Sequence, residues 1–410
     1  MADFRPPLNN GLIIELSRTA LLPAVLWWNR YESVEVDQRL IDTFQQLEGK
    51  RTIICSTHSH RHDPIILFLL SQVLDQQFNY VAAREIFDWW KGFCGWGLQR
   101  HGVYSVNRGT LDRQSMAMTK KLILDGERRL VVFPECEISG RDDKLLPVER
   151  GLVSLFMRST HELQKVQPGE PVYVLPIALQ YRYLNDVSGT LSNAMLRIEK
   201  ELGIAAFEAD LQRRLARIVK RLVAIICTEF GVTVPDDISQ PAQIDRAIER
   251  LLEYCAQSVS FSLPSQADPI ESARLLRAQV DAAMAVRKET SAPYQRSLHK
   301  HMVARNREFN RILETVRRLY ALQDFVRLPK LSQENLATGV ELVEREVFGR
   351  VTQKGKRAVL LTSGTPINLA DRHQQYQRDK RSEVNYLAES IEQQLSELLG
   401  IAPAKPSIAA

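Results

Sequence analysis

The sequence predicts an α/β protein with a mostly parallel sheet flanked by helices, interrupted by an all-helical insertion. Short runs rich in β-branched and aromatic residues alternate with helix-like runs between residues 51 and 183. Helix-like periodicity then continues almost unbroken to residue 352, and one more strand-like run follows it. Alternation of strand and helix is typical of parallel sheets, because parallel neighbours need a long crossover, usually a helix. At 410 residues the chain can hold such a domain and a helical body beside it.

The expected strands are apolar runs bounded by turn residues or by helix-like runs. They are RTIICST at 51–57, FNYVAA at 78–83, GVYSVNR at 102–108, RRLVVFPE at 128–135, PVYVLPIALQYRYL at 171–184 and KRAVLLTSGTPINL at 356–369.

Helices are expected between and after these strands. They are DPIILFLLSQVLDQQ at 63–77, TLDRQSMAMTKKLILDG at 110–126, RGLVSLFMRST at 150–160 and RSEVNYLAESIEQQLSELLG at 381–400. In the first of them Asp63 is the expected N-cap, and Pro64 is the first helical residue, where a missing N–H costs nothing.

The predicted domain organisation follows from this pattern. Residues 1–187 form the first part of the α/β domain, residues 188–354 form the helical insertion, and residues 355–410 supply the last strand and helix. No repeat of fixed period and no low-complexity tract is visible in the chain.

The composition indicates a soluble globular protein, with 44% hydrophobic and 25% charged residues. The net charge of +5 is small for this length, so it favours anionic partners only weakly. The five cysteines show no CxxC spacing, which predicts reduced thiols in a cytosolic protein and argues against a disulfide framework or a zinc cluster.

The most apolar stretch is GLIIELSRTALLPAVLWWNR at 11–30, preceded by an N-terminus without a signal-peptide pattern. Glu15, Arg18 and Pro23 interrupt it, so we do not expect it to cross a bilayer. We expect an amphipathic helix. Its two terminal tryptophans favour the membrane interface, and packing on the protein's own core is the alternative.

The stretch STHSHRHD places His58, His60 and His62 at alternate positions before Asp63. Alternate strand residues point the same way about 6.6 Å apart, so two or three imidazoles could share a metal ion. Further ligands at suitable places are lacking, and no metal is expected. The other interpretation pairs His58 with Asp63 as His-x-x-x-x-Asp: a neutral imidazole accepts a proton from an alcohol while the carboxylate holds its second nitrogen. Asp63 as a simple helix cap is the structural alternative.

Three later stretches follow this pair in order, and together they resemble the glycerolipid acyltransferase family, which includes the lysophosphatidic acid acyltransferases. The family has a His-x-x-x-x-Asp pair, a Gly-x-x-x-x-x-Arg edge, a Phe-Pro-Glu-Gly turn and an apolar strand with proline. These blocks stand here as HSHRHD at 58–63, GVYSVNR at 102–108, FPEC at 133–136 and VLPIA at 174–178.

The resemblance covers roughly residues 12–184 and 356–400 and implies a role for each matching residue. His58 is implied as the general base on the acceptor hydroxyl, which attacks the thioester of acyl-CoA or of an acyl carrier protein, and Asp63 as the residue that orients His58. No cofactor is implied besides this acyl donor, which is a co-substrate. The implied substrate-binding residues are Gly102, Arg108, Phe133, Pro134, Glu135 and Arg84.

Among these, Arg108 is implied to hold the phosphate of the acceptor, Gly102 to let the backbone approach closely, and Glu135 to shape the acceptor site. A surface salt bridge is the structural alternative for Arg108, and a carboxylate that holds its turn is the alternative for Glu135. Arg84 is a weaker phosphate candidate.

The third block departs from the family pattern. Cys136 replaces its glycine, and Glu137 stands where an arginine is frequent, so an anion replaces a cationic phosphate contact. The basic residue expected further along is displaced near Glu149 and Arg150. The acceptor therefore need not be lysophosphatidic acid. His60 and His62 are expected to be polar loop residues facing the cleft.

The helical insertion is locally basic. Eleven Lys and Arg against four Asp and Glu between Arg287 and Lys330 leave a local charge of +7. A solvated helix face is the commonest fate of such charges. The alternatives are an anionic membrane surface and an acidic acyl carrier protein. No nucleic-acid reader motif accompanies the charge, so nucleic acid is not an expected partner.

The predicted function is transfer of a fatty acyl group to a hydroxyl of a lysophosphatidic acid or glycerol-phosphate-like acceptor in phospholipid synthesis. The predicted location is the cytoplasm, peripheral on the inner face of a membrane. The alternative is a non-catalytic lipid-binding or scaffold protein on the same fold.

Overall fold

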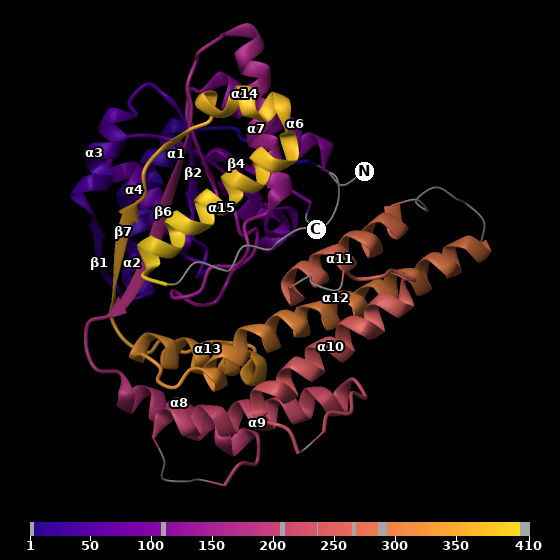
Figure 1. The fold of residues 1–410 in the computed structure, drawn as a ribbon. Coiled ribbons are helices and arrows are strands. Elements are labelled where there is room, and N and C mark those ends of the chain that lie inside the picture. The colour runs from indigo at the N-terminus through magenta and orange to yellow at the C-terminus, as the bar shows by residue number, and fades with distance from the viewer. Residues whose placement is uncertain are drawn as a thin grey trace. The chain divides into compact units, whose positions relative to one another are not determined.

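A computed structural model describes residues 4–107, 112–205, 210–235, 237–264, 268–285 and 293–401, with the backbone alone for 281–285 and 293–304. The chain forms two compact units. The sheet unit comprises Met1–Leu184 with Lys356–Ala410, and the helical unit comprises Asn185–Gly355 (Figure 1).

The sheet unit is built on one mixed sheet with the strand order β1-β7-β6-β2-β5-β3-β4, and β8 pairs with β6. The five strands from β6 to β4 are mutually parallel, while β7 and β1 run antiparallel to β6. The strands are β1 (Tyr31–Val36), β2 (Arg51–Ser56), β3 (Phe78–Ala83), β4 (Val103–Val106), β5 (Arg129–Val132), β6 (Val172–Tyr183), β7 (Arg357–Ser363) and β8 (Ile367–Asn368). The mostly parallel α/β fold predicted from the sequence is confirmed.

The sequence interpretation missed β1 and merged β7 with β8. In β1, Glu32 and Glu35 interrupt the apolar pattern, and this strand lies at the end of the sheet order, where one edge has no neighbouring strand in the described residues. An end strand needs fewer apolar residues than a central one, so the apolar-run criterion does not detect it.

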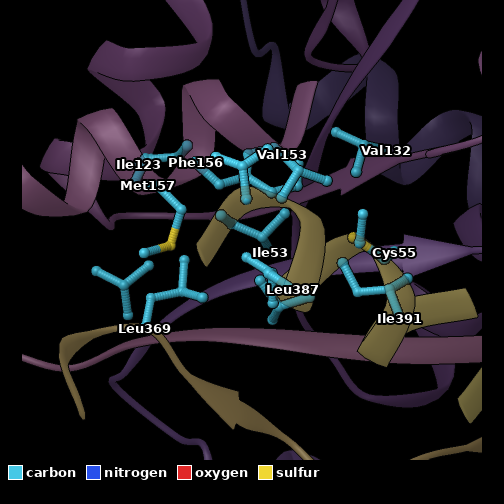
Figure 2. Close-up of a cluster of buried hydrophobic side chains, with 14 of the residues drawn as sticks. Ile53, Cys55, Ile123, Val132, Val153, Phe156, Met157, Leu369, Leu387 and Ile391 are labelled. Carbon is cyan, nitrogen blue, oxygen red and sulfur yellow. The ribbon is translucent and has the colours of Figure 1, made fainter. Parts of the chain in front are cut away.

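Helices cover both faces of the sheet, and β2 shows why. Ile53 and Cys55 point into one buried cluster and Ile54 into the other, as expected from side chains that alternate along a strand. Figure 2 shows the first cluster, where Ile53 and Cys55 meet Phe156 of α7 and Ile391 of α15. The helices of the unit are α1 (Gly11–Leu16), α2 (Leu22–Trp28), α3 (Gln38–Gln46), α4 (Asp63–Val73), α5 (Phe93–Arg100), α6 (Arg113–Asp125), α7 (Arg150–Val166), α14 (His373–Arg378) and α15 (Lys380–Leu399).

Short irregular helices complete this unit. They are the π-helical turn η1 (Ser17–Leu21) between α1 and α2, and the 3-10 helices η2 (Arg84–Gly92) and η3 (Ala370–Arg372). The continuous stretch Gly11–Trp28 is long and apolar enough to cross a membrane by length and composition alone, and 22% of it is buried in the protein. Arg18 lies within it and is buried, donating to the carbonyl oxygen of Gln76.

The helical unit consists, in its described part, of long helices that pack on one another. They are α8 (Ser188–Glu201), α9 (Leu211–Glu229), α10 (Gln240–Ser258), α11 (Pro269–Ala285), α12 (Pro293–Arg327) and α13 (Gln333–Phe348). Leu215, Ile218 and Leu222 of α9 are buried, as the periodicity of that helix predicts. The division into domains expected from the sequence, with boundaries at 187/188 and 354/355, remains a prediction.

Candidate active site

The candidate site lies at the carboxyl ends of the parallel strands. β2 ends at Ser56 and His58 follows it, while β5 ends at Val132 and is followed by Phe133, Pro134 and Glu135. Because β2 and β5 are parallel neighbours, both turns emerge at the same edge of the sheet. Ligands of open α/β sheets bind at this edge.

The first turn brings His58 and Asp63 together. The Nδ1 atom of His58 lies 2.9 Å from Oδ2 of Asp63, and the Asp63 side chain is fully buried while that of His58 is 12% exposed. A carboxylate accepts, so Nδ1 carries the proton and Nε2 holds the lone pair. Among the described residues no hydrogen bond to Nε2 of His58 is found. The arrangement is that of an oriented general base.

Asp63 has two further hydrogen-bond partners. The Tyr181 hydroxyl donates to Oδ1, and the backbone N–H of His60 donates to Oδ2 over 2.9 Å. Burial, followed by the Asp63 charge, holds the pKa of Tyr181 well above its ordinary value, so this phenol stays a donor. Both oxygens of the Asp63 carboxylate are therefore used in hydrogen bonds that fix it within the turn. Asp63 is the first residue of α4 and His62 is the N-cap, which corrects the predicted capping role of Asp63.

The second turn packs against the first. The Phe133 ring stacks on the His58 ring with centroids 4.1 Å apart. The two oxygens of Glu135 accept from the backbone N–H groups of His58 at 2.7 Å and Leu146 at 2.8 Å. Glu135 is thus placed as the carboxylate that holds the turn, the alternative given for it above, and its contact with a substrate stays a prediction.

The other two histidines of the motif have partners of their own. His60 Nε2 lies 3.1 Å from Asp142, and His62 Nδ1 lies 3.0 Å from the hydroxyl of Tyr31. Burial lowers the pKa of His60, but the Asp142 carboxylate outweighs it and the pKa is raised overall. His60 lies in the loop after β2, as expected from the sequence, but its ring is only 14% exposed and is paired with Asp142. The three rings do not converge, and within the described ranges no three His, Cys, Asp or Glu side chains are grouped for a metal ion.

Gly102 is not brought together with His58. It precedes β4, whereas His58 follows β2, so the two residues lie at opposite edges of a parallel sheet. Its φ of +80° favours glycine, and an added Cβ would lie 2.8 Å from Nδ2 of Asn79 and 2.4 Å from Oδ1 of Asn9. A glycine is therefore required at this position by its backbone conformation and by the close packing of Asn9 and Asn79.

The two arginines proposed for phosphate are placed differently. Arg84 follows β3 at the same edge as His58 and pairs with Asp88 at 2.9 Å. Arg108 lies outside the described residues, and the last described residue of its stretch is Asn107, just past the carboxyl end of β4.

Cys136, the departure in the third block, adopts φ +55°. The residue that replaces the expected glycine therefore keeps the left-handed backbone that glycine favours. Its neighbour Glu137 is half-buried. Pro134 is buried, and its carbonyl oxygen accepts from the N–H of Glu149.

Tyr181, Asp142 and Tyr31 are site residues that the sequence interpretation missed. A signal for Tyr181 exists in the strand lengths. β6 spans twelve residues against six in β2, and Ser56 pairs with Ile177, so the end of β6 extends past β2 and flanks the His58 turn. Asp142 and Tyr31 come from a loop and an end strand that carry no comparable pattern.

Comparison with protein families identifies the central part of the sheet unit. A family model described as Acyltransferase matches residues 35–180, which include both turns of the site. A search of curated proteins finds no match to the chain.

Proposed function

Residues 35–180 form an acyltransferase domain of the glycerolipid acyltransferase family, and from this premise we propose that the protein acylates a phosphate-bearing, alcohol-containing lipid precursor. The donor is acyl-CoA or an acyl carrier protein. The acceptor is a lysophosphatidic acid or a glycerol-phosphate-like molecule, and the reaction serves phospholipid synthesis. The observation that carries the proposal is the 2.9 Å contact between His58 Nδ1 and a fully buried Asp63.

In the first step His58 acts as general base. Its Nε2 takes the proton of the acceptor hydroxyl as the oxygen attacks the carbonyl carbon of the thioester. The C–O bond forms and the carbonyl becomes a tetrahedral oxyanion. Asp63 stays ionised and stabilises the imidazolium through Nδ1–H. The Tyr181 hydroxyl and the His60 N–H fix the carboxylate, so the imidazole is oriented before the substrate arrives.

In the second step the oxyanion collapses and the C–S bond breaks. The leaving thiolate receives the proton from Nε2 of His58, which restores the neutral base. The products are the acylated acceptor and the free thiol of the carrier. Neither step forms an acyl-enzyme, because the acceptor oxygen attacks the thioester directly.

Binding of the acceptor is assigned to two arginines, of which Arg84 lies at the same edge of the sheet as His58. Arg108 is proposed as the main phosphate contact, because a guanidinium can pair with phosphate oxygens in a bidentate manner. Arg84 follows a neighbouring strand at that edge and is the second candidate. Phe133 packs the His58 ring from one side, which favours an apolar wall for the acyl chain.

The proposed setting is the cytoplasm, on the inner face of a membrane, where both lipid acceptors and soluble thioesters are available. An acyl carrier protein is acidic and fits the basic stretch of the helical unit described above. Resident metals or cofactors have no step in the proposed reaction.

The test is a panel of acceptors incubated with labelled acyl-CoA and with acyl carrier protein loaded with the same chain. Wild-type protein should acylate one class of phosphate-bearing acceptor, and His58→Ala should lower turnover about 10²–10⁴-fold. His62→Gln is the matched control, since it changes a neighbouring histidine that contacts Tyr31 instead of Asp63. Arg108→Ala should raise the KM for the acceptor and leave that of the donor unchanged.

Two results would contradict the proposal. Wild-type turnover by folded His58→Ala protein would exclude His58 as the general base. Binding of lysolipids without acyl transfer to any acceptor would favour the non-catalytic lipid-binding or scaffold function.

A further inference from the structure

All five tryptophans of the chain are exposed. The exposed fractions are 77% for Trp27, 71% for Trp28, 57% for Trp89, 78% for Trp90 and 44% for Trp96. Tryptophan is usually highly buried, because its large ring contributes much to a core. Here no described core contains one. A surface that exposes every indole of the protein indicates a binding site for a partner with an apolar or interfacial surface.

Four of the five tryptophans fall into two segments with a similar local sequence, and Trp96 follows the second segment in α5. In WWNR at 27–30 and WWKG at 89–92, each pair is followed by an exposed cation, Arg30 or Lys91. Both cations have left-handed backbones, with φ +58° for Arg30 and +59° for Lys91. Trp90 is left-handed as well, at φ +51°. Such conformations are costly for bulky side chains and concentrate at functional positions.

The second segment is anchored in the protein core by the residue that precedes it. Phe87, just before the pair, is 2% exposed and belongs to the buried cluster on the α4 face of the sheet. Gly95 in α5 packs against it so closely that an added Cβ would lie 2.9 Å from the Cβ of Phe87. Phe93 stacks on Trp96 with ring centroids 5.6 Å apart, and Phe93 is itself 64% exposed. The exposed rings of this segment are therefore attached to backbone that is fixed by packing on the core.

Both segments lie at the edge of the sheet where His58 is found. η2, with Trp89 and Trp90, begins directly after the carboxyl end of β3. Trp27 and Trp28 end α2 just before β1, and β1 begins where β6 ends, since Tyr31 and Tyr183 pair with the same residue of β7. The hydroxyl of Tyr31 contacts His62 in the His58–Asp63 turn.

We infer that these two segments are a bilayer-docking surface, which inserts the indoles of WWNR and WWKG into the headgroup region of an anionic phospholipid membrane beside the catalytic turn. Tryptophan rings with flanking Lys and Arg are typical of membrane interfaces, where the ring lies at headgroup depth and the cation reaches the phosphates. Arg30 and Lys91 supply that charge complementarity. The position beside His58 rests on the proposed function, because it places the acyl acceptor at the membrane from which it comes.

Vesicle binding by the full chain tests the inference without any turnover. Vesicles of phosphatidylcholine with roughly a quarter phosphatidylglycerol should bind wild-type protein, and brominated acyl chains should quench its fluorescence. Four of the five tryptophans lie in the two segments and the fifth, Trp96, lies in α5 four residues after the second, so indole fluorescence reports on this region of the protein. Trp89→Ser combined with Trp90→Asn should weaken partitioning about tenfold or more. Asparagine is chosen because it tolerates a left-handed backbone.

Two controls separate this surface from other causes. Tyr254→Ser removes an aromatic ring of comparable exposure, 52%, from the helical unit and should leave vesicle binding unchanged. Turnover on acyl-CoA with water-soluble glycerol 3-phosphate should be the same in the double tryptophan variant and the wild type.

Unchanged vesicle binding by the double variant overturns the inference and leaves the proposed function standing. Loss of binding in a protein that acylates nothing supports the docking surface and defeats the proposed function. A wild-type dimer that ignores vesicles and becomes monomeric in the double variant assigns the surface to a second copy, which also overturns the inference.

Discussion

Each of the two units contains a buried carboxylate with several partners, and in the sheet unit one of those partners keeps a ring nitrogen that has no hydrogen bond among the described residues. Asp63 in the sheet unit bonds His58, Tyr181 and a backbone N–H. Glu344 in the helical unit is 1% exposed and accepts from Lys354 Nζ and from both the N–H and the hydroxyl of Thr352. By burial and number of partners the two look alike.

The two carboxylates differ in whether their charged or titratable partner has a hydrogen-bonding atom that is still unused. Lys354 is fully buried and also donates to the carbonyl oxygen and hydroxyl of Thr352, so its protons are committed to the loop that follows α13. His58 uses Nδ1 on Asp63, and its Nε2 has no hydrogen bond among the described residues. A buried charged pair therefore indicates chemistry only when one member retains a titratable atom that a substrate can reach.

Asp63→Asn is the change that separates the two carboxylates most strongly. An amide at this position can donate to Nδ1 of His58, which favours the tautomer with the proton on Nε2, where the base is needed. Turnover should fall by about 10³–10⁴, the size of the effect known for the aspartate of serine protease triads. The measurement is steady-state turnover on the acceptor found in the panel, with folding checked by circular dichroism.

Tyr181→Phe is the matched control for this loss. It removes one hydrogen bond to Asp63 but leaves the His58 contact, so turnover should fall much less, about tenfold or below. Equal losses for the two variants would mean that damage to the buried turn, and not the tautomer of His58, explains the effect of Asp63→Asn.

Lys354→Met makes the complementary change in the helical unit. It leaves Arg197, 3.0 Å away, as the remaining cationic partner of the buried Glu344, and the free energy of unfolding should fall by up to about 3–5 kcal/mol. Chemical denaturation monitored by circular dichroism measures the loss. Combining Lys354→Met with Glu344→Leu should recover much of it, because apolar replacement of a buried pair is often close to neutral. A loss under about 1 kcal/mol in the single variant would mean that the Lys354–Glu344 pair contributes little to stability.

The contrast also shows which parts of the site could be predicted from the sequence. The His58–Asp63 contact spans five residues across one turn, so spacing and local structure suffice to expect it. The sheet position of Phe133 follows from a second strand in the same parallel sheet. Both predictions rest on regular elements, whose geometry is the same in every protein that uses them.

The residues that were missed come from long-range placement. Tyr181 reaches Asp63 from 118 positions away, and His60 is paired with Asp142 of a loop whose path no periodicity specifies. Gly102 was misplaced for a different reason: its motif begins before β4 and runs through that strand, so Gly102 lies at the edge of the sheet opposite to His58. A motif fixes spacing along the chain, and the strand direction decides which end meets the substrate.

The smallest expected effect distinguishes two neighbouring histidines of this turn by pH. Burial, with Arg61 and then His60 and Arg357 nearby, lowers the pKa of His62 from its ordinary 6.5 to about 4. As pH falls through 6.5 the unfolded chain binds this proton and the folded one does not, so stability is lost between pH 6.5 and 4, by on the order of 3 kcal/mol. His62→Gln, which can still accept from Tyr31, should flatten that part of the stability curve in denaturation measurements at a series of pH values. The raised pKa of His60 acts in the opposite sense: its contribution is full below pH 6.5 and is lost as pH rises, so Asp142→Asn should lower stability most in acid. If His62→Gln follows the wild-type curve below pH 6.5, His62 is not the group that titrates there.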